Sequence, residues 1–313
     1  MAVAEGWFAF TREGRCERFS ATGQSLWQVA LSNQQWLAAL LIPHQRIVLV
    51  SQRGGVCALD VGKGRVIWSI QTEGCFAQAP LFGEDEAVAR LWMVSQEDGR
   101  IFCLRADDGH VIWTSEPTNR SDGELARIGA WLVYGNCDGA LHLFGAADGQ
   151  HVASIPVGEN DQMAGGLCVM KRGLIAAGTR SGLLIVADPQ KRAVLARAKL
   201  EATETFSTPI EFAPDRLAMA TPDGRLTFWT YSDAGLVAAG SITVGTLVRE
   251  IVQTSRTIWC LVDQGLVSID VRSRAQKHYA LGDDCSGLTP GGENECVACI
   301  VDGDLVVVKG GAE

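Results

Sequence analysis

The stretch RIVLVSQRGGVCALDVGKGRVIW, residues 46–68, decides the fold of this chain. It contains an apolar run, a polar turn with glycine, a second apolar run, another glycine turn, and a third run that ends at Trp68. Short apolar runs bounded by glycine turns are typical of β-strands joined by hairpins. Such a unit cannot bury its apolar side chains alone, so copies of it must pack on one another.

The same unit recurs along the whole chain. Further early copies are WFAFTREGRCERFSATGQSLW (7–27), ARLWMVSQEDGRIFCLRADDGHVIW (89–113) and AWLVYGNCDGALHLFGAADGQHVAS (130–154), and less regular copies follow. The glycines of the first turn are Gly14, Gly55, Gly99, Gly139, Gly182, Gly224, Gly265 and Gly303. Their spacings of 38 to 44 residues match the length of a four-stranded propeller blade.

The repeat predicts an all-β fold, a β-propeller of four-stranded antiparallel blades that forms a single domain over residues 1–313. Complete blades are expected over about 33–282, and the terminal strands over 6–31 and 285–310 are expected to close the ring, because closure protects the sheet edges. The N-terminal blade lacks a first strand in this interpretation, and the C-terminal blade lacks a fourth. The count favours eight blades, and seven is the alternative if the terminal pieces merge into one.

Composition excludes several classes of partner. The net charge of −9 and the pI near 5.1 argue against a nucleic-acid or anionic-membrane surface, which needs clustered Lys and Arg. No stretch of 18 apolar residues is free of charge, so we expect no membrane insertion. The first residues carry no basic region typical of a secretory signal. The ten cysteines are therefore interpreted as reduced, and we expect a cytoplasmic protein.

No residue pattern indicates a catalytic, metal or cofactor site. Cys296 and Cys299 are three apart on a predicted strand, so their side chains point to opposite faces and cannot share a metal ion. The segment GKG at 62–64 lies in a turn rather than before a helix, which excludes a phosphate-binding loop. We predict no catalytic residue, no metal and no cofactor, although a Ser/His/Asp site assembled from distant loops stays open.

Three segments carry a family resemblance: ATGQSLW at 21–27, VGKGRVIW at 61–68 and ADDGHVIW at 106–113. They resemble the PQQ-like, quinoprotein-type repeat of β-propellers, and the likeness extends over essentially the whole chain. The resemblance implies that Trp27, Trp68 and Trp113 are structural and pack between adjacent blades. The family includes exported quinoprotein dehydrogenases and cofactor-free assembly or scaffold proteins. This chain has no adjacent cysteine pair and no calcium ligand set, which favours the cofactor-free branch.

These observations predict a non-catalytic interaction platform or scaffold subunit of a cytosolic multiprotein assembly. The partner is expected to be a protein that binds a propeller face or an open blade edge. The alternative is an enzyme with a site at the central channel, either a quinoprotein-like oxidoreductase or a hydrolase. Because one fold hosts unrelated functions, the choice depends on the site rather than on the repeat.

Two surfaces are candidates for the partner. The loops between second and third strands, together with the connections between blades, are rich in carboxylates and predict an acidic face for a basic partner segment. The residues singled out on this face are Glu97, Asp98, Glu201, Glu204, Asp283 and Asp284. Solubility and turn chemistry are the alternative explanation for these carboxylates. Basic residues such as Arg272 and Arg274 fall in the opposite set of loops.

The second surface is the edge of the C-terminal strand. Without a fourth strand, the segment around Val307 presents an unpaired edge that can accept a strand from another chain. The alternative is that residues 1–5 fold back and cover this edge.

Overall fold

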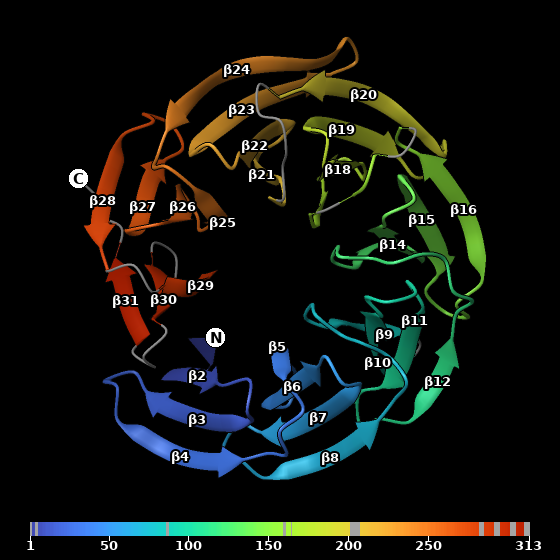
Figure 1. The fold of residues 1–313 in the computed structure, drawn as a ribbon, viewed down its shortest axis with the longest axis vertical. Helices are drawn as coiled ribbons and strands as arrows, with labels where there is room; N and C mark the ends of the chain where they lie inside the picture. The colour runs from blue at the N-terminus through green and yellow to red at the C-terminus, as the bar shows by residue number, and fades with distance from the viewer. Residues whose placement is uncertain are drawn as a thin grey trace. The chain divides into compact units, whose positions relative to one another are not determined.

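The computed structural model describes residues 2–3, 6–85, 88–158, 161–163, 165–200, 207–281, 285–290, 295–300 and 305–309. All the regular structure in these residues is β-strand (Figure 1). None of this part of the chain forms a helix long and apolar enough to cross a membrane. The chain divides into two compact units, Met1–Ser154 and Ile155–Glu313.

The first unit contains four antiparallel sheets, each built from four strands in sequence order. The first two sheets are β1 (Ala2–Val3), β2 (Gly6–Phe10), β3 (Arg15–Ser20), β4 (Ser25–Ala30), and β5 (Trp36–Ile42), β6 (Arg46–Ser51), β7 (Gly55–Asp60), β8 (Val66–Gln71). The next two are β9 (Leu81–Asp85), β10 (Val88–Val94), β11 (Ile101–Arg105), β12 (Val111–Thr114), and β13 (Ala126–Ile128), β14 (Trp131–Gly135), β15 (Ala140–Gly145), β16 (His151–Pro156). The last strand, β16, ends just beyond the boundary between the units.

The second unit repeats this plan. Its sheets are β17 (Leu167–Val169), β18 (Ile175–Gly178), β19 (Leu183–Asp188), β20 (Ala193–Lys199); β21 (Ile210–Ala213), β22 (Arg216–Ala220), β23 (Arg225–Ser232), β24 (Gly235–Thr243); β25 (Val248–Gln253), β26 (Thr257–Val262), β27 (Gly265–Asp270), β28 (Gln276–Ala280); and β29 (Cys285–Pro290), β30 (Glu295–Ile300), β31 (Leu305–Lys309). Each sheet is one blade, numbered here from 1 to 8 in chain order, and the eighth has three strands.

The four-stranded antiparallel blades agree with the sequence prediction, but the terminal blades differ in part. Seven of the eight sheets are complete four-stranded blades, against the eight blades first expected, and the eighth sheet has three strands in the described residues. The N-terminal blade was predicted to lack its first strand, which was wrong, because Ala2–Val3 pair with Gly6–Trp7. A two-residue strand is too short to produce a visible alternation of apolar and polar residues. The C-terminal sheet has three strands in the described residues, as predicted.

Tryptophan side chains dock the first blades onto one another. Trp27, Trp68 and Trp113 come from the fourth strands of blades 1, 2 and 3. Each ring lies against a glycine of the next blade, in the turn before its fourth strand: Gly64, Gly109 and Gly149. These glycines have positive φ, and a Cβ on Gly109 would come within 2.7 Å of the Trp68 ring. Only glycine allows both this backbone conformation and the close approach of the ring.

Hydrogen bonds fix the rings in place. Trp27 Nε1 donates to Val61 O at 2.7 Å, and Trp68 Nε1 donates to Ala106 O at 3.0 Å. At the third interface, Trp92 of β10 donates to the corresponding carbonyl, Ala146 O, at 3.1 Å. The Trp113 indole N–H is buried without a partner in the described structure. The third docking contact therefore depends on packing against Gly149.

Apolar clusters between successive blades form the core. Between blades 2 and 3, Val48, Ala58, Trp68, Leu91 and Leu104 are buried together. A sheet face of this kind is stable only when the next sheet covers it. The sequence analysis predicted that each repeat buries its apolar face against the next repeat. The blades inside each unit pack in this way.

Gly109→Ala tests the ring-on-glycine contact, with Gly23→Ala as its matched control. Both glycines have positive φ in the turn before a fourth strand, but a Cβ on Gly23 would meet nothing within 4 Å. Both substitutions carry the backbone strain, and only Gly109→Ala displaces Trp68, so it should lower the free energy of unfolding by about 2 kcal/mol more. Urea unfolding of both variants measures the difference, and equal losses would contradict the contact.

Candidate protein-binding surfaces

Large apolar side chains are exposed in a recurrent pattern on the fourth strands of the first three blades. The exposed residues directly before the docking tryptophans are Leu26 (50%), Ile67 (41%) and Ile112 (38%). Val66 (47%) and Val111 (40%) precede two of them. We call these five residues the apolar row. Their recurrence at one place in three blades distinguishes them from apolar residues scattered singly over a surface.

The strand geometry explains the exposure. Side chains alternate along a strand, so Trp68 enters the interface between blades and its neighbour Ile67 faces outward. The fourth strand is also the edge of its sheet, with one side of its backbone unpaired by the sheet. The sequence analysis assigned the tryptophans of LW and VIW to the interfaces between blades, but it did not recognise the residues before them as exposed. Strand alternation next to each docking tryptophan could have predicted this exposure.

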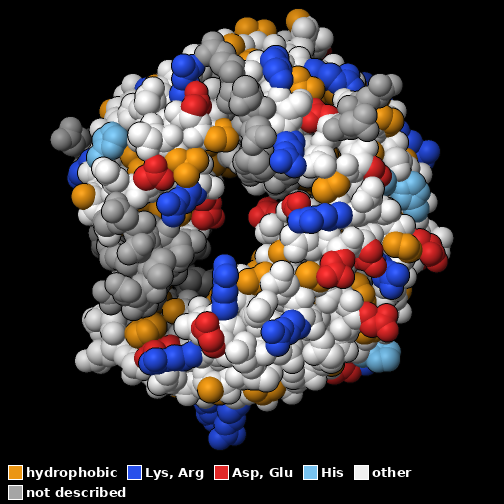
Figure 2. Space-filling view, in the orientation of Figure 1, with side chains coloured by type: hydrophobic (Ala, Val, Ile, Leu, Met, Phe, Trp, Pro, Cys, Tyr) orange, Lys and Arg blue, Asp and Glu red, His pale blue; other side chains and the backbone are white. Residues whose placement is uncertain are grey.

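The carboxylates of the hairpin turns are largely used for local contacts. Asp98 accepts a hydrogen bond from Arg100 N at 3.1 Å and pairs with the Arg100 guanidinium at 3.5 Å. Asp223 pairs with Arg225 at 3.4 Å in the equivalent turn of blade 6. The face drawn in Figure 2 likewise shows acidic and basic side chains interspersed. Glu97 is exposed on the blade 3 hairpin.

Four of the other residues proposed for partner binding lie outside the described residues: Glu201, Glu204, Asp283 and Asp284. Val307 lies in β31, opposite Val297 of β30. In the described structure, β30 is the neighbour of β31 within the three-stranded sheet, so the other edge of β31 has no strand from that sheet. Residues 2 and 3 pair with β2 of their own blade.

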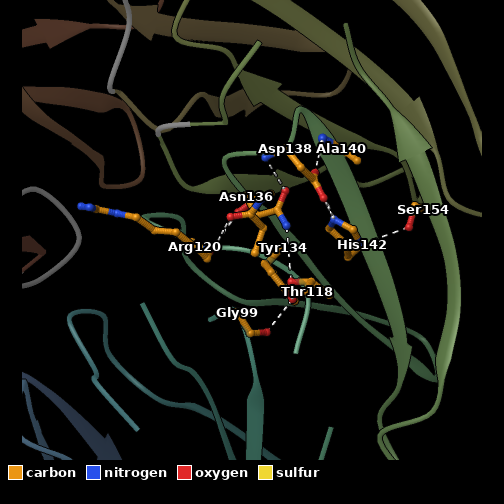
Figure 3. A network of polar contacts seen from close by, with 12 residues as sticks. Gly99, Thr118, Arg120, Tyr134, Asn136, Asp138, Ala140, His142 and Ser154 are labelled. Carbon is orange, nitrogen blue, oxygen red and sulfur yellow. Dashed lines mark hydrogen bonds and ion pairs between the residues drawn. The ribbon is translucent and has the colours of Figure 1, made fainter. Parts of the chain in front are cut away.

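A polar network joins blade 3 to blade 4 (Figure 3). The Tyr134 hydroxyl donates to Gly99 O at 2.6 Å, across the interface, and lies 2.7 Å from Thr118 Oγ1. Asn136 is fully buried, and its Nδ2 donates to Thr118 Oγ1 at 3.3 Å. Burial raises the pKa of the Tyr134 hydroxyl, which therefore remains protonated and able to donate.

The same network contains an Asp, a His and a Ser. His142 is buried, with Nε2 3.1 Å from Asp138 Oδ2 and Nδ1 3.1 Å from Ser154 Oγ. Ser154 Oγ also lies 3.0 Å from His151 Nε2, and the His142 ring stacks on Tyr134. These contacts tie the hairpin of blade 4 to its fourth strand. In the sequence, His142 was recognised only as a residue alternating within a strand, although Asp138 four positions earlier hinted at the pair.

The described residues offer no set of three His, Cys, Asp or Glu side chains arranged for a metal ion. Cys296 and Cys299 lie in β30, and their side chains are outside the described structure. Burial raises the pKa of the Cys16 thiol to about 12 and that of Cys57 to about 11. These two thiols are therefore protonated and unreactive at neutral pH.

Tyr134→Phe tests the structural role of the blade 3–blade 4 network. The substitution leaves Gly99 O and Thr118 Oγ1 without the phenol hydroxyl in a buried site, and should lower the free energy of unfolding by about 2 kcal/mol. Tyr231→Phe is the control, because Tyr231 is also buried and no hydrogen bond of its hydroxyl is among those described. Thermal or urea unfolding gives both values, and a neutral Tyr134→Phe variant would contradict the assigned role.

Comparisons with known proteins match part of the sequence. Residues 12–162 match the family model described as outer membrane protein assembly factor BamB. The curated BamB of Yersinia pestis is 27% identical over 137 residues, which cover 44% of this chain and 33% of that protein. BamB of Pseudomonas aeruginosa is 27% identical over 114 residues, covering 36% of this chain and 28% of that protein. The chain thus matches about a third of the length of these relatives.

Solved structures resemble the chain over nearly its whole length. The crystal structure of BamB from Moraxella catarrhalis has a TM-score of 0.79 at 16% identity, covering 98% of this chain and 95% of that chain. The computationally designed Ika8 protein has a TM-score of 0.80 at 15% identity, covering 99% and 94%. At such identities the likeness shows the fold alone.

Proposed function

Because this chain is a β-propeller built from PQQ-like repeats, we propose that it is a non-catalytic subunit that binds a protein partner within a larger assembly. The apolar row on β4, β8 and β12 carries the proposal. An exposed apolar surface of this kind marks a site of protein association. The matched relatives are named as assembly factors, which supports the same general role.

The partner uses apolar side chains and an extended segment. Ile67 and Ile112 offer apolar contacts, and the strands that carry them are sheet edges whose free N–H and C=O groups can pair with an added strand. Together these features favour a strand-donating partner over a purely ionic one. The carboxylates near Glu97 contribute less to a basic partner, because Asp98 already pairs with Arg100.

The edge of β31 is a second place for strand addition. Its residues Leu305–Lys309 include three consecutive valines, which have high β-propensity. The strand pairs with β30 on one side, and its sheet supplies no fourth strand on the other in the described residues. A partner strand at this edge would complete the blade.

Charge substitutions in the apolar row test the proposal. The double variant Ile67→Asp/Ile112→Asp should reduce recovery of the native partner in affinity purification at least about tenfold, because it places charges in an apolar contact. Thr114→Asp is the control, since Thr114 is exposed on the same strand as Ile112 but outside the row. Recovery is measured by quantitative mass spectrometry. A partner that survives the double variant, or is equally lost with Thr114→Asp, contradicts binding through the row.

Proline substitutions identify the contribution of β31 in the same experiment. Backbone N–H groups alternate in direction along a strand, so one of Val306→Pro and Val307→Pro blocks the free edge and the other removes a bond to β30. If the edge binds a strand, one variant loses the partner at unchanged melting temperature. Retention of the partner by both folded variants excludes this edge.

We also propose that the protein works in a reducing compartment, the cytoplasm. The buried thiols of Cys16, Cys57, Cys75 and Cys260 form no disulfide in the described structure. Such unpaired, buried thiols are compatible with a reducing environment. Alkylation of the freshly extracted, denatured protein should label all ten cysteines. A disulfide-linked fraction that labels only after reduction would contradict this location.

A further inference from the structure

Loops of blades 6 and 7 line an open hollow of about 550 Å³ whose wall includes four arginines. Arg216 begins β22, Arg256 lies between β25 and β26, and Arg272 and Arg274 lie in the turn between β27 and β28. Phe212 and Val271 form apolar parts of the wall. Such a concentration of positive charge is unexpected in a chain whose net charge is −9.

The backbone around the hollow is fixed by hydrogen bonds. Val271 N donates to Arg256 O at 3.0 Å, which joins two of the loops of blade 7. Gln253 Nε2 donates to Phe212 O at 3.2 Å, which joins blade 7 to blade 6. The arginines therefore project from a preformed frame rather than from independent loops.

Arg274 replaces the docking glycine of the early blades. Its φ is 62°, and its amide donates to Asp270 O at 2.9 Å, as the amide of Gly64 donates to Asp60 O in blade 2. Its guanidinium stacks on Phe228 of blade 6, with Cζ 3.1 Å from the ring centroid. A non-glycine residue in this conformation is strained by about 1–2 kcal/mol.

The described residues offset the positive charges of the hollow only in part, because the carboxylate of Asp270 interacts electrostatically with Arg272. None of the described residues that line it is acidic, and no described ion pair involves Arg216, Arg256, Arg272 or Arg274. The nearby carboxylate of Asp270 accepts hydrogen bonds from Arg272 N at 2.9 Å and Ser273 N at 2.7 Å, so it holds the turn.

Arg274 shows the imbalance most clearly. Its Nη1 is buried without a hydrogen-bond partner in the described structure. Burial lowers the pKa of the Arg274 guanidinium, and the charge of Arg216 lowers it further. A buried guanidinium nitrogen without an acceptor is costly, and an anion in the hollow would lower the electrostatic repulsion between Arg274 and Arg216.

We propose that this hollow is a binding site for a diphosphate group, either as free pyrophosphate or at the end of an organic molecule. Guanidinium groups bind phosphoryl oxygens through paired hydrogen bonds, which suits several arginines arranged around one anion. A terminal phosphoryl group carries a charge of about −1.5 to −2 at neutral pH, and a second phosphoryl group adds further negative charge, so a diphosphate matches four arginines better than one carboxylate does. The site is independent of the protein-binding surfaces proposed above.

Calorimetric titration of the full chain with pyrophosphate tests the proposal at low ionic strength, where screening is weak. The double variant Arg256→Gln/Arg272→Gln should weaken binding at least about tenfold, because it removes two charge-assisted contacts. The control is Lys191→Gln/Arg192→Gln, which removes two positive charges from the corresponding turn of blade 5. Arg192 has φ 54°, as Arg274 has φ 62°, so the turns match in backbone.

The outcomes separate specific from general attraction. The site is supported if the protein binds pyrophosphate tightly, the Arg256→Gln/Arg272→Gln variant loses this binding, and the Lys191→Gln/Arg192→Gln control keeps it. Citrate, which carries a similar charge without phosphoryl groups, should bind at least about tenfold more weakly. No measurable pyrophosphate binding, an equal loss in both double variants, or equal affinity for citrate overturns the proposal. A nucleoside diphosphate titrated in parallel identifies the source: tighter binding than pyrophosphate indicates an organic ligand, and equal binding the free anion.

Arg274→Gly provides an independent variant, because glycine is the residue that blades 2, 3 and 4 have at this turn position. It relieves the backbone strain while removing the stacked guanidinium. The variant should remain folded, as judged by its melting temperature, and should lose pyrophosphate affinity. A folded Arg274→Gly variant with unchanged affinity would show that Arg274 is not part of the site.

Discussion

The contact of a tryptophan ring with a glycine of the following blade is the interaction on which the first part of the structure depends. It requires a glycine with positive φ and no Cβ, and it brings the ring N–H within reach of a backbone carbonyl, as Trp27 and Trp68 show. Because the ring enters the interface, the residue before it must face outward. One motif therefore determines both the docking of blades and the position of the exposed Leu26, Ile67 and Ile112.

Where the motif is lost, the interface acquires other properties. In blade 5, Ala196 of β20 pairs with Val186 at the place where Trp68 pairs with Ala58 in blade 2. In blade 7, Arg274 stands at the position of the docking glycine, and its guanidinium covers Phe228. The docking glycine is replaced there by an arginine, which lines an open hollow together with Arg216, Arg256 and Arg272. The proposed anion site therefore lies among the irregular repeats, and the apolar row lies on the regular ones.

Much of the fold could be predicted from the sequence, because turn glycines such as Gly14 and Gly99 mark the hairpins and alternation marks the strands between them. The two-residue strand at Ala2–Val3 could not be predicted, since its pairing depends on the neighbouring strand rather than on any pattern of its own. The acidic face was predicted by counting carboxylates in the loops. That count did not consider the ion pairs and hydrogen bonds that these carboxylates make within their own turns. Asp98 and Asp223 each pair with the arginine that follows the turn glycine, which the sequence D-G-R already indicated. The arginine hollow was not predicted, because its residues come from three separate loops.

Hydrogen–deuterium exchange of the native protein tests most directly whether the ring-on-glycine contact controls the stability of the blades. Blades 2 and 3 have this contact on both sides, so the amides of β7 and β11 should exchange more slowly than those of β23 and β27, after correction for sequence. Exchange from β7 and β11 that is as fast as, or faster than, exchange from β23 and β27 would contradict the account.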